Sequence, residues 1–243
     1  MPDRLWYCTR QRAGPLVKES RAMRPRLSAT DDLYTRSQKS KILRPPSDSS
    51  VCRSRVDRLE LRLALFGFEG VCYTLTFEDE ALPENWREMG NRWRAFLGRL
   101  KRWKGRPFDY IYVREGRHGD RRYHDHAVLR YSDFSPPEIE HLWRYGGVDS
   151  EPLLRGAGDS YRRMARYYNK EASDGLKIPV GARPWVCSRS LAAQLPPPER
   201  WMDAAGGIEI PGDVMSSGRN ATENEFGAYQ YAWYIKKKTG LLF

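Results

Sequence analysis

The sequence predicts an α+β protein built on a central antiparallel β-sheet that is flanked by helices. Apolar, β-branched segments alternate with amphipathic ones in the order strand, helix, strand, strand, helix, strand, helix between residues 59 and 195. Two of the strands are separated by a short turn, which predicts a hairpin and therefore an antiparallel pair. The helices between the strands can cover one face of such a sheet.

The first four elements are clear in the sequence. VCYTLTF (71–77) is dense in β-branched and aromatic residues and predicts a strand. A helix begins near Pro83, and its apolar stripe, expected to face the core, consists of Trp86, Met89, Trp93, Phe96, Leu97, Leu100 and Trp103. Gly105 and Pro107 end this helix. FDYIYVREG and RRYHDHAVLRY then predict two strands on either side of an HGD turn.

The remaining elements follow from start signals and apolar runs. SPPEIEHLWRYG has the start of a short helix at Ser135 to Glu138. VDSEPLL predicts a further strand. DSYRRMARYYNKEA predicts a helix that is capped by Asp159 or Ser160.

The two ends of the chain differ from this region in composition. Residues 1–58 are rich in Arg, Ser and Pro without a steady period, which predicts a basic, largely disordered segment. Residues 196–243 contain many Gly, Asn, Ser and Pro and are expected to be a loose C-terminal extension. Its last stretch, FGAYQYAWYIKKK, fits an edge strand or a helix. The predicted catalytic domain is therefore 59–195.

The charge balance favours a polyanionic partner. The chain has 42 Lys and Arg against 31 Asp and Glu, a net charge of +11. Arginine dominates, and its planar fork suits phosphate. The four cysteines form no CxxC pair, which argues against a zinc ribbon. A charged start and the lack of a long apolar run predict a cytoplasmic protein with no membrane partner.

Two histidines in the third strand predict a metal site. His124 and His126 project from one face of a strand, with Asp125 on the other. The hairpin brings Glu115 near the pair. A carboxylate with two imidazoles suits Mg²⁺ or Mn²⁺ better than structural Zn²⁺. The alternatives are exposed histidines beside arginines and a solvated Glu115.

The last helix carries two tyrosines. Tyr167 and Lys170 are three residues apart and share a face, whereas Tyr168 points about 100° away. A tyrosine hydroxyl is a poor nucleophile near neutral pH, but a nearby divalent cation would polarise a phosphate that it attacks, and a lysine could stabilise charge. The alternative is that both rings belong to the core.

In combination these stretches resemble a known family. YTLTF (73–77), YIYVREGRHGDRRYHDHAVLR and ARYYNKE (165–171) look like the three motifs of the HUH endonucleases, in the same order. They are most similar to the rolling-circle replication initiators of phages and plasmids. GARPWVCSRSL resembles the segment after the catalytic helix. The resemblance covers residues 67 to 195.

The resemblance implies both a site and a reaction. It implies an HUH/RRM-like sheet with a metal bound by His124, His126 and Glu115. Tyr167 would attack a backbone phosphate of single-stranded origin DNA, with Tyr168 as the alternative nucleophile and Lys170 stabilising charge. The products are a 5′-phosphotyrosine bond and a 3′-hydroxyl that primes a polymerase, and the bond can later be rejoined. Since the sequence has no GxxxxGK[ST] loop, unwinding would require a host helicase.

Several arginines are candidates for binding nucleic acid. They lie on the long helix and before the histidines: Arg92, Arg99, Arg102, Arg121 and Arg122. One departure from the family is Asp125, which replaces a bulky apolar residue and which could pair with Arg122, Arg130 or another arginine. The alternatives are a relaxase or single-strand transposase with the same chemistry, and a non-catalytic nucleic-acid-binding protein with a degenerate site.

Overall fold

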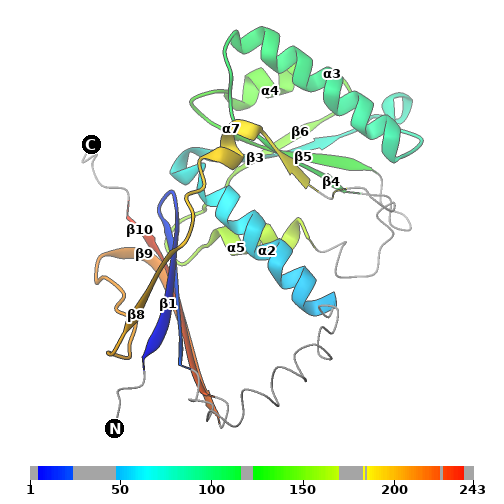
Figure 1. Cartoon of the computed structure of the whole chain (residues 1–243). Helices are drawn as coiled ribbons and strands as arrows, with labels where there is room; N and C mark the ends of the chain where they lie inside the picture. The colour runs from blue at the N-terminus through cyan, green and yellow to red at the C-terminus, as the bar shows by residue number, and fades with distance from the viewer. Residues whose placement is uncertain are drawn as a thin grey trace. The chain divides into compact units, whose positions relative to one another are not determined.

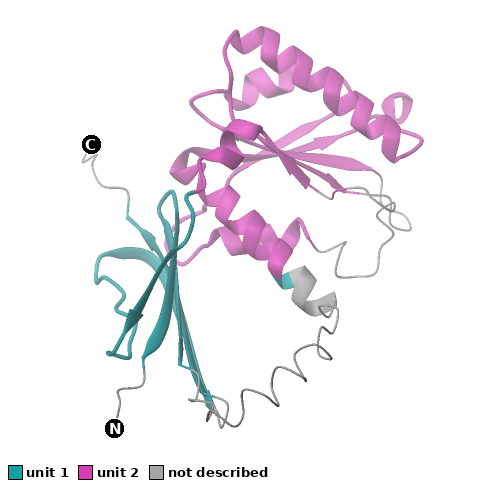
Figure 2. Cartoon of the chain, in the orientation of Figure 1, with its two compact units in different colours: residues 1–53, 196–243 teal, residues 54–195 magenta. Residues whose placement is uncertain are grey.

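The computed structural model describes residues 5–23, 48–115, 123–169, 183, 185–224 and 227–237. The chain divides into two compact units, which Figure 2 shows in different colours. Unit 1 comprises Met1–Arg53 and Pro196–Phe243, and unit 2 comprises Ser54–Leu195.

Unit 2 contains a five-stranded sheet in the order β6-β3-β5-β4-β7 (Figure 1). All four neighbouring pairs are antiparallel, which confirms the predicted α+β fold with a central antiparallel sheet. The strands are β3 (Gly70–Thr76), β4 (Ile111–Glu115), β5 (His124–Arg130), β6 (Val148–Pro152) and β7 (Trp185–Cys187). The predicted hairpin is the β4–β5 pair.

Five α-helices are described along the chain: α2 (Asp48–Ala64), α3 (Trp86–Lys104), α4 (Pro136–Leu142), α5 (Tyr161–Tyr167) and α7 (Arg189–Ala193). Two short 3₁₀ helices, η1 (Gly67–Glu69) and η2 (Asp79–Ala81), flank β3. Helix α3 begins at Asn85, whose side chain accepts hydrogen bonds from the backbone N–H groups of the first turn. It ends at Gly105, which has a φ of 67°. None of these helices is long and apolar enough to cross a membrane.

Helices α3 and α4 cover one face of the sheet (Figure 1). Trp93, Phe96 and Leu100 of the α3 stripe are buried there, as predicted, and the ring of Trp93 stacks on Tyr112 of β4 with centroids 3.9 Å apart. Trp103, predicted to belong to the same stripe, is instead 53% exposed, and its indole N–H donates to Glu138 of α4. This cluster includes Tyr73, Leu75, Phe96, Leu100, Ala127, Leu129, Ile139 and Leu142.

The opposite face of the sheet is also covered, by α2 and α5 (Figure 1), so the expectation of helices on one face is wrong. Arg162 of α5 joins the two helices through ion pairs with Asp57 and Glu60 of α2, at 2.7 and 2.9 Å. The physical reason is that β3, β4 and β5 also carry apolar side chains on this side. Cys72, Ile111 and Val128 are buried and need cover.

Unit 1 contains a second five-stranded sheet, in the order β8-β1-β2-β10-β9, with every neighbouring pair antiparallel. Its strands are β1 (Trp6–Ala13), β2 (Leu16–Met23), β8 (Glu199–Asp203), β9 (Val214–Asn224) and β10 (Gly227–Lys236). The unplaced C-terminal stretch is therefore a strand from Gly227 onward. Residues 24–47 lie outside the described residues.

The prediction of a disordered N-terminal segment and a loose C-terminal extension is wrong where these strands lie. Strands β1 and β2 belong to residues 1–58, and β8, β9 and β10 belong to residues 196–243. Some of the charges in these strands form ion pairs within the sheet. The Glu19 carboxylate is buried and lies 2.8 Å from Arg10 and 3.0 Å from Arg21. The predicted boundary between residues 58 and 59 falls inside α2, whereas the one between 195 and 196 coincides with the limit of unit 2.

Candidate metal centre

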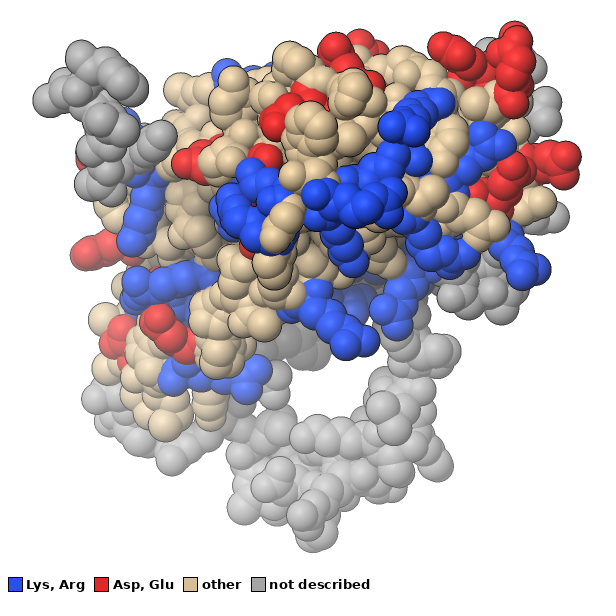
Figure 3. All heavy atoms as spheres, turned by 90° about the horizontal axis from the view of Figure 1, so that it is seen from above, with Lys and Arg blue, Asp and Glu red and all other residues tan. Residues whose placement is uncertain are grey.

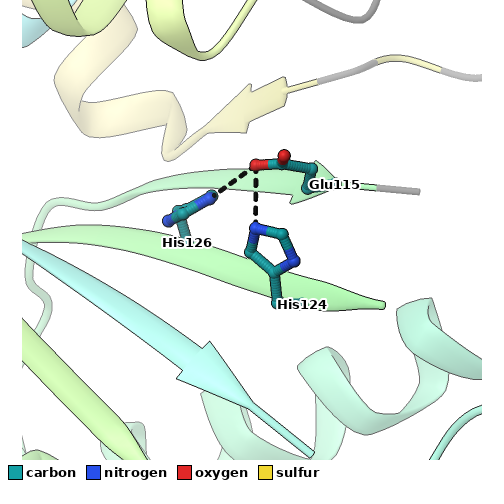
Figure 4. A group of neighbouring side chains, drawn as sticks. All are labelled: Glu115, His124 and His126. Carbon is teal, nitrogen blue, oxygen red and sulfur yellow. Dashed lines mark hydrogen bonds and ion pairs between the residues drawn. The ribbon is translucent and has the colours of Figure 1, made fainter. Parts of the chain in front are cut away.

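The β4–β5 hairpin places three potential metal ligands on one face of the sheet. Glu115 lies directly opposite His124, and Val113 lies opposite His126. Directly paired residues share a face, and so do residues two apart in a strand, so the carboxylate and both imidazoles project to the same side (Figure 4). Of the eight residues that connect the two strands, 116–122 are not described.

The three side chains converge on one carboxylate oxygen. Oε2 of Glu115 lies 2.9 Å from Nε2 of His124 and 3.0 Å from Nε2 of His126. Glu115 and His126 are buried, while the His124 side chain is 20% exposed. All three ligand atoms lie within 4.8 Å of one another. Three acceptor atoms directed at one place require a proton or a cation between them, so this donor set fits a divalent ion.

Thr74 of β3 orients one of the imidazoles. It pairs with His126 across the sheet, and its Oγ1 lies 3.2 Å from Nδ1 of that ring. If the ring donates its Nδ1 proton to Thr74, the Nε2 lone pair is left facing Glu115, which is the arrangement that a metal ligand needs. Sequence reasoning gave Thr74 no role, although it lies in the YTLTF motif. The pairing of Thr74 with His126 in the antiparallel β3–β5 register would have identified it, but the sequence alone does not show that register.

The two adjacent tyrosines have different environments. Both rings contact His126, with centroid distances of 5.7 Å for Tyr167 and 5.0 Å for Tyr168. Tyr167 is 41% exposed, whereas Tyr168 is 5% exposed. Burial beside the thiol of Cys72 raises the pKa of Tyr168 well above its ordinary value. Solvent therefore reaches Tyr167, whereas Tyr168 is shielded from it. Lys170 lies outside the described residues.

Asp125 points to the opposite face, into the core under α3. It is fully buried, and its Oδ1 accepts a hydrogen bond of 2.8 Å from the Tyr112 hydroxyl. Burial raises the pKa of Asp125 to about 7, against the opposing effects of Tyr112 and Arg114. The expected approach of another arginine is met in part by Arg114, which lies opposite Asp125 in the β4–β5 pair and lowers its pKa. Among the described residues the hydrogen bond to Asp125 comes from the Tyr112 phenol.

The arginine that was expected beside Asp125 has other partners. Arg130 donates to the backbone oxygens of Leu65 and Phe66 and lies 3.6 Å from Asp109. Arg122 is among the residues that are not described. Since Asp125 and the histidines lie on opposite faces, the carboxylate leaves the candidate metal site unaltered.

Two of the predicted nucleic-acid-binding arginines instead hold the fold together. Arg92 forms an ion pair with Glu88 at 2.6 Å, and its guanidinium lies 5.4 Å from the ring centre of Tyr145. Arg99 donates to the Leu142 carbonyl at 2.8 Å and lies 5.0 Å from the same ring. Arg102 is exposed, with its cationic end available to a ligand. Arg121 and Arg122 fall in the part of the chain that is not described.

No family model, curated protein or solved structure matches this chain.

Proposed function

We propose that unit 2 is a metal-dependent endonuclease and strand transferase that acts on single-stranded DNA, as a rolling-circle replication initiator does. The observation that carries this proposal is the convergence of Glu115, His124 and His126 beside the exposed Tyr167. A bound cation and a solvent-accessible hydroxyl next to it are the two parts that phosphoryl transfer to tyrosine needs.

The reaction exchanges one phosphodiester bond for another. The Tyr167 oxygen attacks the phosphorus, and a bond forms between them. The bond from phosphorus to the 3′-oxygen breaks, and that oxygen leaves as a hydroxyl after taking up a proton, which balances the proton lost by the tyrosine. Because the product is still a phosphodiester, attack by a 3′-hydroxyl reverses the step without ATP.

Each residue of the site has a separate task. Glu115, His124 and His126 would hold Mg²⁺ or Mn²⁺, which when bound supplies positive charge that polarises a phosphoryl oxygen. Thr74 keeps the His126 ring in the tautomer that leaves Nε2 available. Tyr168 packs against His126 from the protein interior and supports the end of α5. The resemblance assigns charge stabilisation to Lys170.

Origin recognition is the broader part of the proposal, and it rests on the resemblance to the HUH endonucleases. The 3′-hydroxyl released by Tyr167 would prime a polymerase, and a host helicase would supply the single strand. The alternative of a degenerate, non-catalytic binder drew its support from Asp125. That carboxylate is buried on the other face of the sheet and so gives the alternative no support.

The test is covalent capture on labelled single-stranded DNA with Mn²⁺, read on a denaturing gel. Wild type and Tyr168→Phe should give a protease-sensitive band of reduced mobility, and Tyr167→Phe or EDTA should abolish it. Tyr168→Phe is the matched control, because it makes the same chemical change at the neighbouring tyrosine, whose hydroxyl is in the core. Loss of the band with Tyr168→Phe alone would reverse the assignment of the nucleophile. If no candidate origin sequence gave an adduct while DNA was still bound, the catalytic proposal would be wrong.

A further inference from the structure

A basic pocket lies in unit 2 away from the candidate metal centre. It has a volume of about 710 Å³ and is formed by the last turn of α3, the segment 105–110 and the start of α7. Four of its lining residues are cationic: Lys101, Arg102, Arg106 and Arg189. No acidic residue lines it. Figure 3 shows that Lys and Arg side chains gather on one face of the molecule.

Three of these cations have no counter-charge within the described part of the chain. Lys101, Arg102 and Arg189 are exposed, and none has an ion pair or hydrogen bond there. Arg106 lies 2.7 Å from Asp133, but 60% of its side chain is exposed. Gathering like charges around one cavity is unfavourable unless an anion offsets them. This differs from Arg92 and Arg99, whose charged groups are engaged within the fold.

In a neighbouring pocket of unit 2, carboxylates offset the charge of the lining arginines. It has a volume of about 370 Å³, and Asp109 and Asp133 line it together with Arg106 and Arg130. Asp133 pairs with Arg106, and Arg130 lies 3.6 Å from Asp109. An anion would meet carboxylates there. The acid-free pocket is therefore the better anion site of the two.

The inner wall of the basic pocket is aromatic and rigid. Phe108 and Tyr110 line it, with ring centroids 6.2 Å apart. Tyr110 is held by Trp93 of the core at 5.7 Å. Cations together with aromatic side chains are the combination that proteins use for single-stranded nucleic acid, where phosphates meet charge and bases meet aromatic surface.

We infer that this pocket binds the backbone of single-stranded DNA at a distance from the bond that is cut. The identity of the ligand rests on the proposed function. Tyr110 directly precedes β4, and Glu115 is its last residue. Five residues of strand span roughly 17 Å, at about 3.3 Å per residue. A few nucleotides of a single strand can bridge that distance. The pocket would thus hold the strand that flanks the cleaved bond.

A binding measurement without metal tests the inference separately from catalysis. Fluorescent oligonucleotides of increasing length are titrated in EDTA with wild type and with a Lys101→Gln/Arg102→Gln/Arg189→Gln variant. For a long oligonucleotide we expect at least a 10-fold loss of affinity. Because binding to single strands has a salt slope of about −0.7 per phosphate contact, three lost contacts should make the slope about 2 smaller. Arg102→Lys/Arg189→Lys should restore most of the affinity, because it keeps the charge.

The matched control neutralises three other exposed arginines of unit 2, as Arg87→Gln/Arg94→Gln/Arg155→Gln. If this control loses as much affinity as the pocket variant, or if the pocket variant binds like wild type, the pocket is not a DNA site. If inorganic phosphate displaces short and long oligonucleotides from the protein equally well, the pocket is a site for free anions. This result would also overturn the inference. The two proposals can also fail separately. If the pocket variant loses DNA binding while the wild type never forms a covalent adduct, the pocket is a DNA-binding site and the proposed nuclease activity is wrong.

Discussion

The two faces of the sheet in unit 2 differ, although the same strands form both. One face packs into the core, and the other carries the candidate metal ligands. Under α3 and α4, alternate residues of β5 are Asp125, Ala127 and Leu129, all of them fully buried. On the other face the alternate residues are His124, His126 and Val128. Along this second face the side chains are apolar at Val128 and polar toward the start of the strand, at His126 and His124. The candidate site lies where apolar packing gives way to polar side chains at the start of β5.

The largest expected effect comes from removing charge on the polar face. Glu115→Gln keeps the size of the side chain but removes the carboxylate that faces both imidazoles. Mn²⁺ affinity should fall by more than about 100-fold, beyond what loss of an outer partner causes. Titration calorimetry measures this. Asp125→Asn, the matched change on the buried face, should leave Mn²⁺ affinity within a few-fold of wild type, and equal losses would show that the two faces are not independent.

An intermediate effect is expected from the residue that orients His126. Thr74→Val keeps the shape of the side chain but removes the hydroxyl that lies 3.2 Å from Nδ1. Mn²⁺ affinity should fall by about 10- to 100-fold, with little change in the thermal midpoint. Thr74→Ser should retain most of the affinity. Unchanged binding in Thr74→Val would mean that the hydroxyl does not set the orientation of the ring.

A smaller effect, on stability alone, is expected on the buried face. Tyr112→Phe removes the donor to Asp125 and leaves a buried carboxyl group without that bond. The free energy of unfolding should fall by about 1–3 kcal/mol, as measured by urea denaturation. The double variant Tyr112→Phe/Asp125→Leu should recover much of this loss, because both polar groups are then absent. A loss of Mn²⁺ binding in Tyr112→Phe would contradict the separation of the faces.

The smallest effect concerns Asp109, a carboxylate whose surroundings differ from those of Asp125. Burial alone would raise its pKa, but hydrogen bonds from Ser190, Gln194 and Ser188 outweigh it and leave the pKa lowered. A lowered pKa stabilises the fold at pH values above the unfolded pKa, and this contribution is lost as pH falls through the folded pKa. Asp109→Asn should therefore cost about 1 kcal/mol or less at pH 7.

The pH dependence provides the check on Asp109. Unfolding curves for wild type and Asp109→Asn should approach each other as pH falls below about 4, where the carboxylate takes up its proton in both states. A gap that stays constant from pH 7 to pH 3 would show that the charge of Asp109 has no part in the effect.

Much of unit 2 can be predicted from the sequence, because its signals are local. The period of the α3 stripe and the antiparallel pairing of β4 with β5 are both local features. The grouping of Glu115 with the histidines follows from strand alternation and hairpin pairing alone. Helix α2 was missed because its first residues, DSSVCRSR, resemble linker composition.

The parts that escaped prediction depend on partners distant in sequence. The strands of unit 1 pair residues near the two ends of the chain, and their charges are neutralised only once that sheet has formed, as with Arg21 and Asp203. Arg92 and Arg99 looked like a phosphate-binding face because their partners, the ring of Tyr145 and the Leu142 carbonyl, lie in another element. The different exposure of Tyr167 and Tyr168 follows from packing against β3 and β5.

On the proposed function, the burial of Tyr168 would limit how many DNA ends one molecule can hold. Of the two tyrosines beside the candidate metal site only Tyr167 is exposed, so the site would carry one strand at a time and would offer no second tyrosine of this pair for a further cut. Closing a circle would then require attack by an incoming 3′-hydroxyl, and a second cut would require another copy of the protein. On the proposed function, the number of cuts in a complete cycle is therefore set by how many chains gather at the DNA.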